Sequence, residues 1–199
     1  MGFLDTVLGR KKPVRPNLDA LFAIPAAAIT LQVSMDLLPT GSGAVAFRSV
    51  EGRAMADVEQ EIRDLLDADG GPPVSLVNDE FGFTWLVVTT DAAAESSEAD
   101  VSSIVTDLHA VNVTLADHGF GSQLLCSLIP FSDPTEQMVA LIYLYKRGTF
   151  YPFAPARDGS EQRDNVAELK VRDQLAGELP WESDLSRWFA VWGAPGTSN

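Results

Sequence analysis

The side chains that most often carry out chemistry are few in this chain, and their spacing argues against a shared site. The two histidines, His109 and His118, are nine residues apart in a segment with helical periodicity. Nine steps of about 100° put the two imidazoles on opposite sides of one helix, so they cannot bind one metal ion from that helix. His118 directly precedes Gly119 at the predicted helix end, where an interaction with the helix dipole accounts for it. We therefore assign no metal ligands.

The single cysteine and the many carboxylates do not define a catalytic site either. Cys126 lies in the apolar stretch 124–129, where no neighbour in sequence would lower its pKa, so we expect a buried, unreactive thiol. The acidic residues between 57 and 67 decorate a predicted helix, and we interpret them as its solvated side. The sequence contains no phosphate-binding loop, no complete dinucleotide fingerprint and no nucleophile elbow. We assign no catalytic residue and no cofactor.

A run of aromatic and basic residues between 143 and 155 is the first candidate for a binding site. It places Lys146 and Arg147 among five aromatic side chains, in a chain that is otherwise acidic. Basic side chains beside aromatic rings can hold an anionic or peptide partner. The alternative is a β-hairpin with cross-strand aromatic pairs and solvated turn charges. From this run we predict partner contacts by Tyr145, Lys146, Arg147, Tyr151 and Phe153.

A tryptophan-rich segment near the C-terminus is the second candidate. Spacings of three, four and seven residues would place its apolar side chains on one face of a helix over Pro180–Trp192. Such a face either packs on the sheet or, if it is exposed, marks a partner site. The residues that share it are Trp181, Leu185, Trp188, Phe189 and Trp192, and we add Trp188 and Trp192 to the predicted partner-binding set.

The first sixteen residues (1–16) differ in character from the rest of the chain. They carry four basic residues and one acidic residue, a net charge of +3, which leaves −17 for the remainder. Apolar residues followed by a basic cluster are typical of a helix that anchors to an anionic membrane surface. The alternatives are a frayed terminus or a short helix docked on the protein's own core. The predicted membrane-anchor residues are Phe3, Leu4, Val7, Leu8, Arg10, Lys11 and Lys12.

Composition narrows the classes of function. The chain has 199 residues, of which 46% are hydrophobic, enough for one domain with its own core. Its 28 acidic and 14 basic residues give a net charge of −14, which repels phosphate, so we expect no nucleic-acid ligand. We expect no membrane span, because no unbroken apolar run reaches roughly 20 residues. One cysteine and no signal peptide favour a cytoplasmic protein, peripheral at the inner face of the membrane if the N-terminal segment anchors it.

The elements that must position these residues recur as two strands followed by a helix. Short turns join the paired strands, which favours antiparallel pairing, and the helix after each pair favours an α+β fold. We expect an antiparallel sheet from three hairpin-plus-helix units, with the helices mainly on one face. One domain would cover 17–193, followed by a flexible tail over 194–199. The predicted strands are 29–35, 44–50, 74–77, 83–90, 122–131, 137–145 and 149–153. The predicted helices are 55–69, 101–115, 162–179 and 180–192, and a short helix that Asn17 caps and Pro25 ends precedes them. Residues 92–100 are predicted to form an acidic loop.

Several stretches, taken in their order and spacing, resemble a known family. They are Met1–Asp5, Asn17–Phe22, Pro39–Phe47, Phe81–Val88, Asp107–His109, Gly119–Leu125, Lys146–Pro155 and Asn165–Leu175. Together they resemble the PspAB family of PspA-associated proteins, small prokaryotic proteins linked to the phage-shock, or envelope-stress, system. The likeness covers roughly residues 1–180, and it leaves out the acidic loop and the last dozen residues.

This resemblance implies association with other proteins and brings no known catalytic residues. PspA-type proteins are coiled-coil proteins that remodel membranes, and the resemblance also implies a link to HtpX, a membrane metallopeptidase. We therefore expect a non-enzymatic adaptor of the envelope-stress response that binds a PspA-like protein or an HtpX-like peptidase. Two alternatives stay open. One is a ligand-sensing domain with a small molecule near Trp85 or Tyr151, and the other is an enzyme that uses unrecognised carboxylates.

Overall fold

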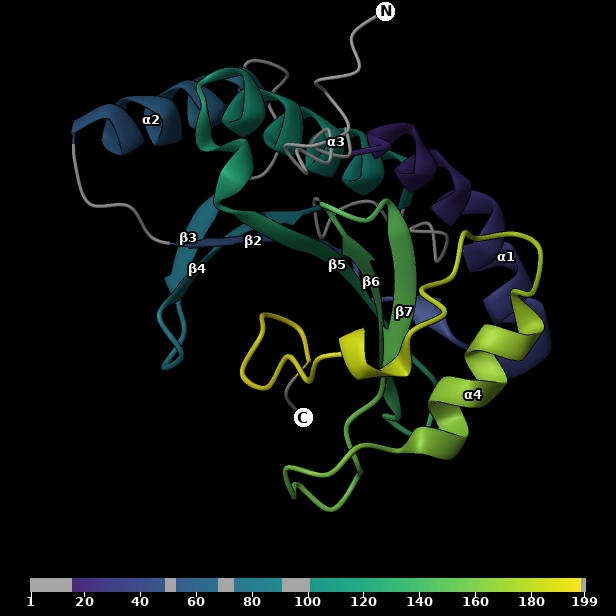
Figure 1. Cartoon of the computed structure of the whole chain (residues 1–199). Helices are drawn as coiled ribbons and strands as arrows, with labels where there is room; N and C mark the ends of the chain where they lie inside the picture. The colour runs from purple at the N-terminus through teal and green to yellow at the C-terminus, as the bar shows by residue number, and fades with distance from the viewer. Residues whose placement is uncertain (1–15, 49–52, 68–73, 91–100, 198–199) are drawn as a thin grey trace, which may run out of the picture.

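The computed structural model describes residues 16–48, 53–67, 74–90 and 101–197, which form an antiparallel sheet and a layer of helices (Figure 1). The predicted acidic loop 92–100 and the segment 1–15 lie outside the described residues. The strands are β1 (Leu38–Pro39), β2 (Ser42–Arg48), β3 (Ser75–Asn78), β4 (Phe83–Thr89), β5 (Leu124–Ser132), β6 (Met138–Leu144) and β7 (Thr149–Phe153). The helices are α1 (Ile24–Met35), α2 (Arg53–Asp67), α3 (Val101–Asp117) and α4 (Asn165–Gln174), with 3-10 turns η1 (Leu18–Ala23), η2 (Phe120–Ser122) and η3 (Leu185–Arg187).

The strands of the sheet follow the order β3-β4-β2-β5-β6-β7, and every neighbouring pair is antiparallel. The short β1 pairs with β5 at Phe131 and Ser132, beyond the stretch of β5 that pairs with β2. The strands β2, β4, β5 and β6 are buried at nearly every position. A strand whose two faces are both buried needs cover on both sides of the sheet.

The helices cover one face of the sheet. Ile104 and Leu108 of α3 share a core cluster with Val45 and Phe47 of β2, and buried residues of α1, α2 and α4 join the same cluster. Figure 1 shows α2 and α3 across one side of the sheet, with α1 and α4 continuing the layer beside β7. This arrangement confirms the predicted α+β fold with an antiparallel sheet and helices mainly on one face.

The opposite face is covered by the C-terminal segment, residues 180–197. Ala46 and Cys126 on this face form a second core cluster with Trp188 and Ala194 of the segment. Figure 1 shows the segment in yellow, on the side of the sheet away from α2 and α3. Ala194, where we expected a flexible tail to begin, is buried, so the segment packs on the sheet as far as that residue.

The predicted strand 29–35 is wrong, because these residues belong to α1. Pro25, which we expected to end a short helix, lies in the first turn of α1, where proline is tolerated because the N–H it lacks would have no helical partner. The apolar residues over 29–35 alternate with polar ones as they would in a strand, but the buried residues of α1 as a whole follow a helical period. These buried residues are Ile24, Ala27, Ala28 and Leu31.

The predicted helix 180–192 is also wrong, since the segment contains only the single 3-10 turn η3. Its first residues bond to β7 instead. The Phe150 N–H donates to the Pro180 carbonyl and the Glu182 N–H donates to the Phe150 carbonyl, both at 2.8 Å. Backbone groups used in this way are not free for helical hydrogen bonds. The tryptophan-rich residues therefore do not share one helical face.

The remaining elements agree with the predictions to within a few residues at most ends. The glycine after α3, Gly119, has a φ of 87°, which suits its predicted place at the helix end. The helix predicted over 162–179 is shorter and begins after Asp164, whose side chain accepts a hydrogen bond from the Ala167 N–H. Such a capping contact fixes where the helix begins.

The packing of α3 on β2 leaves no room for a side chain at Gly43. A Cβ at this position would lie 2.7 Å from Cγ2 of Ile104 and 3.0 Å from Cδ1 of Leu108. We expect Gly43→Ala to lower the free energy of unfolding by about 1–3 kcal/mol, because the core must shift to admit the methyl group. The control is Gly121→Ala, whose Cβ would be 3.5 Å from its nearest neighbour. Urea unfolding measures both, and equal stability of the two variants would contradict the close packing.

Candidate functional site

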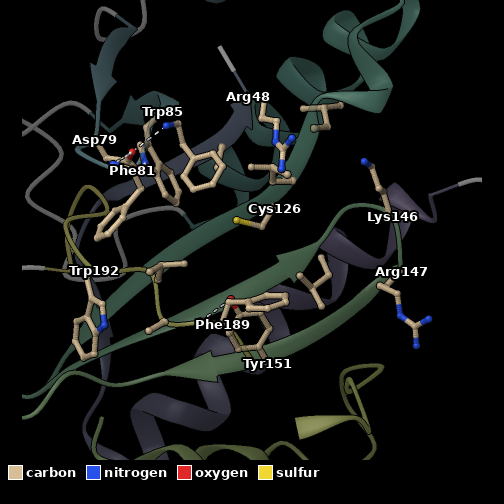
Figure 2. Close-up of a pocket in the computed structure, with 17 residues that line it drawn as sticks. Arg48, Asp79, Phe81, Trp85, Cys126, Lys146, Arg147, Tyr151, Phe189 and Trp192 are labelled. Carbon is tan, nitrogen blue, oxygen red and sulfur yellow. Dashed lines mark hydrogen bonds between the residues drawn. The ribbon is translucent and has the colours of Figure 1, made fainter. Parts of the chain in front are cut away.

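A pocket of about 560 Å³ opens on the sheet face that the C-terminal segment covers (Figure 2). Trp85, Cys126 and Tyr151 line its sheet side, and they come from β4, β5 and β7. Phe189 and Trp192 of the C-terminal segment line the other side. We call this cavity the open-face pocket. Its size and its mostly apolar walls are typical of sites that hold small molecules.

A β-bulge shapes the floor of the open-face pocket. Ala46 of β2 lies opposite Cys126, but the next residue, Phe47, lies opposite Leu124, so Leu125 has no partner on β2. The bulge brings Leu125 and Cys126 to the pocket together. Burial raises the pKa of the Cys126 thiol to about 12, so the thiol stays protonated and unreactive near neutral pH, as the sequence predicts.

The turn between β3 and β4 forms one wall of the open-face pocket, and Asp79 holds it in place. Its Oδ1 accepts hydrogen bonds from the N–H groups of Phe81 at 2.9 Å and Phe83 at 2.8 Å. Its Oδ2 accepts one from the indole N–H of Trp85 at 2.8 Å. Asp79 is the only carboxylate among the described residues that line the pocket. Both of its oxygens are therefore used to fix the wall.

Basic side chains gather at the other end of the open-face pocket, where Arg48, Lys146 and Arg147 lie (Figure 2). The Lys146 ammonium donates a hydrogen bond to the Ser122 carbonyl at 2.7 Å. This acceptor is neutral, and no carboxylate within the described ranges pairs with Lys146. Arg147 turns away from the cavity. Within the described part of the chain, the side chain of Arg48 has no hydrogen-bond or ion-pair partner.

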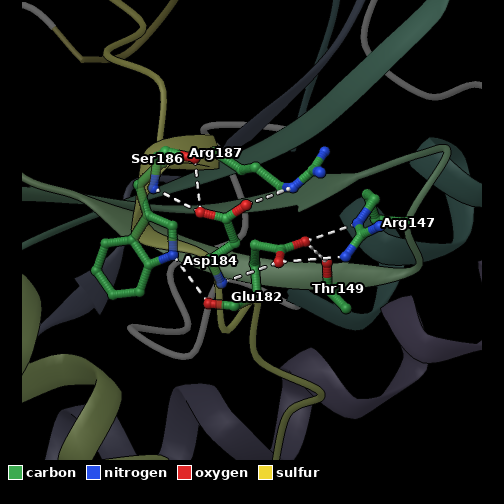
Figure 3. A network of polar contacts seen from close by, with 7 residues as sticks. Arg147, Thr149, Glu182, Asp184, Ser186 and Arg187 are labelled. Carbon is green, nitrogen blue, oxygen red and sulfur yellow. Dashed lines mark hydrogen bonds and ion pairs between the residues drawn. The ribbon is translucent and has the colours of Figure 1, made fainter.

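Glu182 fixes the start of the C-terminal segment against β7 (Figure 3). Its buried carboxylate accepts hydrogen bonds from Nε of Arg147 at 2.9 Å, from the Thr149 hydroxyl at 3.1 Å and from the Asp184 N–H at 3.1 Å. The indole N–H of Trp188 donates to the Glu182 backbone carbonyl at 3.0 Å. The hydrogen bond from Arg147 is the main cause that holds the pKa of Glu182 below its ordinary value.

Arg163 and Tyr151 fix the middle of the C-terminal segment. The Arg163 guanidinium donates to the backbone carbonyl of Trp188 and lies 5.5 Å from the ring centre of Phe153. The Tyr151 hydroxyl donates to the Phe189 carbonyl at 3.0 Å. Burial raises the pKa of Tyr151 well above its ordinary value, so this hydroxyl remains a donor. These contacts turn an irregular segment into a fixed wall of the open-face pocket.

The structure brings together four of the seven predicted partner-binding residues. Lys146, Arg147, Tyr151 and Trp192 line the open-face pocket. Phe153 and Trp188 are buried between the sheet and the C-terminal segment, and Tyr145 is buried on the helical side. The predicted membrane-anchor residues lie outside the described residues.

Trp85 and Tyr151, which the sequence offered as neighbours of a small molecule, line the same cavity. The sequence did not single out Arg48 or Asp79. Each had a weak signal: Arg48 is the charged end of an apolar strand, and Asp79 lies in a polar turn before an aromatic strand. Their place beside Lys146 and Trp192 follows from strand order and from the C-terminal segment, which no local pattern reveals.

The two histidines contact different elements: His109 lies in α3, and His118 directly follows the end of this helix. The ring of His109 packs on Phe22 with the ring centres 5.0 Å apart, and Nε2 of His118 lies 3.0 Å from a carboxylate oxygen of Glu61 in α2. Nowhere in the ranges that the structure describes do three histidine, cysteine or acidic side chains gather as a metal site requires.

A second, open hollow of about 500 Å³ lies near the start of α4. Its charged side chains already serve the local structure. Asp158 accepts hydrogen bonds from Ser160, Asp164 caps α4, and Arg157 donates to the side chain of Gln137 at 2.7 Å. We therefore assign this hollow no site.

The outer side of α1 exposes apolar residues in a regular row. Phe22 in η1 is followed by Ala26, Ile29 and Val33, at spacings of four, three and four residues, and all four are exposed. Ile29 is 64% exposed and Val33 is 83% exposed. The chain carries no charged residue from 20 to 35. We call these four residues the α1 stripe.

The helix that carries this stripe, Leu18–Met35, is long and apolar enough to cross a membrane, judged by length and composition alone. Core helices of soluble domains can satisfy the same test. Here Leu21, Ile24 and Leu31 on its inner side belong to the main core. We therefore interpret it as a core helix whose outer side is also apolar.

These features describe a small α+β domain with an apolar pocket on one face of its sheet and an exposed apolar helix on the other. The family described as PspA associated protein B, PspAB, matches residues 1–196. The chain belongs to this PspA-associated family, which confirms the resemblance seen in the sequence. No curated protein and no solved structure matches the chain.

The Glu182 network predicts a specific dependence of stability on pH. Because the folded state lowers the pKa of Glu182, the ion pair stabilises the fold above the ordinary value of 4.5 and is lost as the pH falls through the lowered pKa. We expect Glu182→Gln to lower the free energy of unfolding by roughly 1 kcal/mol at pH 7, since the half-exposed Arg147 is screened by solvent. The difference from the unmodified protein should shrink below pH 4.5.

Urea unfolding at a series of pH values measures this difference. The matched control is Glu161→Gln, an exposed glutamate that should leave stability unchanged at every pH. A constant difference between Glu182→Gln and the unmodified protein from pH 7 to pH 3 would contradict a role for the ionised carboxylate.

Proposed function

We propose that this protein is a non-enzymatic adaptor of the envelope-stress response that binds a PspA-like coiled-coil protein through the α1 stripe. The observation that carries the proposal is the exposed row at spacings of four, three and four residues, in a chain of the PspA-associated family. This alternation of three and four residues is the spacing of apolar seam positions in coiled coils.

The surface of α1 supports a docking role on physical grounds. A helix that is apolar on all sides is normally buried on all sides. Here the inner residues are buried, but Ile29 and Val33 face water. The chain carries no charged residue from 20 to 35, so a partner helix could cover this surface without burying a charge of this protein.

Neighbouring contacts hold the α1 stripe in position. Phe22, its first residue, packs on the ring of His109 in α3. Thr30 donates a hydrogen bond to the carboxylate of Glu178 at 2.9 Å, which ties α1 to the chain after α4. A partner helix would therefore meet a preformed surface, which keeps the entropic cost of binding low.

An HtpX-like membrane peptidase is the second candidate partner. The heptad-like spacing favours the coiled-coil protein, because a seam of this kind packs side chain by side chain against another helix. The two candidates are separated by measuring each purified protein against the same variants.

We expect Ile29→Glu to abolish binding to the PspA-like protein of the same organism, because a carboxylate would be buried in the apolar seam. Isothermal titration calorimetry on the two purified proteins measures the loss, with at least a tenfold weaker affinity as the expected result. The control is Val166→Glu on α4, which makes the same kind of change at a residue that is also 64% exposed.

Far-ultraviolet circular dichroism of both variants checks that the fold is intact. Equal loss of binding in Ile29→Glu and Val166→Glu would contradict a specific role of the α1 stripe. If the peptidase bound this protein and the PspA-like protein did not, the peptidase would be assigned as the partner.

The predicted membrane anchor, residues 3–12, completes the proposed adaptor. The described chain begins beside the β6–β7 turn, where the Tyr143 hydroxyl donates to the Asn17 carbonyl at 2.8 Å. From that point Asn17 leads directly into η1 and α1. An anchored N-terminal segment would thus hold the α1 stripe near the membrane surface, where a membrane-remodelling partner works.

We expect the full-length protein to sediment with vesicles of phosphatidylglycerol and phosphatidylcholine, and a variant lacking residues 1–12 to stay in solution. Basic residues are attracted to the anionic lipid, so added salt should release the protein. Vesicles of phosphatidylcholine alone are the control. If the full-length protein does not sediment with anionic vesicles, the anchor hypothesis fails, while binding through the α1 stripe remains to be judged by calorimetry.

A further inference from the structure

We propose that the open-face pocket binds a single-chain anionic amphiphile, a molecule with one long apolar chain and a carboxylate or phosphate head. The chain would lie among the aromatic side chains at one end, and the head would meet Arg48 and Lys146 at the other. The pocket and the α1 stripe are on opposite faces of the sheet. The inference therefore stands independently of the proposed adaptor function.

The apolar end of the pocket is built from aromatic rings. Trp85, Phe81 and Trp192 surround it (Figure 2). Phe81 is 54% exposed and Phe189, at the opposite side of the mouth, is 61% exposed. Exposure of aromatic rings of this size to water is unfavourable, and an apolar chain between the rings would remove much of their surface from solvent.

At the cationic end of the pocket, not every basic side chain is paired with an acidic one. Arg147 is neutralised by Glu182. Among the described residues, Arg48 has no side-chain partner and Lys146 bonds only to a backbone carbonyl. Figure 2 shows Arg48 and Lys146 on the side of the cavity away from Trp192. Asp79, the carboxylate in the lining, already accepts three hydrogen bonds at the aromatic end. The unpaired charge of the pocket is therefore positive.

The middle of the pocket is neutral. The Cys126 thiol stays protonated, and the Tyr151 hydroxyl is bonded to the Phe189 carbonyl. Positive charge at one end, neutral groups in the middle and aromatic rings at the far end match the polarity of an amphiphile along its length. A purely apolar ligand would leave the two cations without an anion.

The cationic end of the pocket stands out because the rest of the chain is strongly acidic. After residue 16 the chain carries 27 acidic and 10 basic side chains, yet Arg48 and Lys146 both line this one cavity, and among the described residues neither is paired with a carboxylate. Basic side chains placed only for solubility would be spread over the surface. Their collection beside an apolar cavity favours recognition of an anionic head.

Four probes test the proposal on the full-length protein after lipid has been removed. They are dodecanoate, dodecyl phosphate, dodecanol and inorganic phosphate. The two anionic dodecyl probes are used below the concentration at which they form micelles, and dodecanol is used below its limit of solubility. Tryptophan fluorescence and calorimetry measure binding, since Trp85 and Trp192 line the cavity. We expect both anionic dodecyl probes to bind one per chain, dodecanol to bind at least tenfold more weakly, and inorganic phosphate to give no signal. The stronger of the two anionic probes identifies the head group.

Variants separate the two ends of the pocket. Arg48→Gln and Lys146→Gln should each weaken both anionic probes about tenfold and leave dodecanol unchanged, because each removes one charge-assisted contact with the head. The matched control is Lys170→Gln on α4, an exposed lysine far from the lining residues. Leu125→Trp should fill the cavity and abolish binding of all dodecyl probes, with thermal melting to confirm that the variant folds.

Three results would overturn the proposal. The first is equal affinity for dodecanol and dodecanoate with no effect of Arg48→Gln, which would leave the cationic end without a role. The second is no binding of either anionic probe. The third is binding only after residues 1–12 are deleted, which would mean that the protein's own N-terminal segment fills the pocket. Failure here with intact binding of the PspA-like protein would leave the adaptor function standing.

Discussion

The central sheet is apolar on both faces, and the rest of the structure depends on how each face is kept from water. In β6 every residue from Val139 to Tyr143 is buried, so neither face can be left open. The helices cover one face. The other is left to the C-terminal segment, which is short and irregular and cannot span the whole sheet. The open-face pocket is the part of this face between the segment and the β3–β4 turn.

Polar contacts, more than apolar area, set the position of that segment. The buried carboxylate of Glu182 accepts hydrogen bonds from the half-exposed Arg147 and from Thr149, and Arg163 donates to the carbonyl of Trp188. Hydrogen bonds need a definite distance and angle, whereas apolar contacts do not, so these few bonds restrict where the segment can lie. The shape of the pocket depends on them, because the segment forms one of its walls.

The sequence predicts the strands well where apolar runs are continuous, as over Phe83–Thr89 and Met138–Leu144. It fails at α1 because apolar residues also lie on the exposed side of this helix. Ile29 and Val33 are apolar although they face water, so they hide the helical period of the buried residues and leave an alternation that looks like a strand. It fails again after Pro180, because the contacts that order this segment join residues far apart in sequence, such as Tyr151 and Phe189, which are 38 positions apart.

The same limits apply to the pocket. Sequence reasoning found Lys146 and Arg147 from their aromatic neighbours, but only strand order brings Arg48 beside them. Once they are together, the acidic body around them restricts what they can bind. At physiological salt the field of distant carboxylates is screened beyond about 8 Å, so two nearby cations dominate inside the cavity although the whole chain is negative. A small anion would still gain too little from two partly solvated cations, whereas an anion that carries an apolar chain also gains from covering the aromatic rings. Burial and charge must therefore act together in this pocket, which is why an amphiphile suits it better than either a free phosphate or a neutral hydrocarbon.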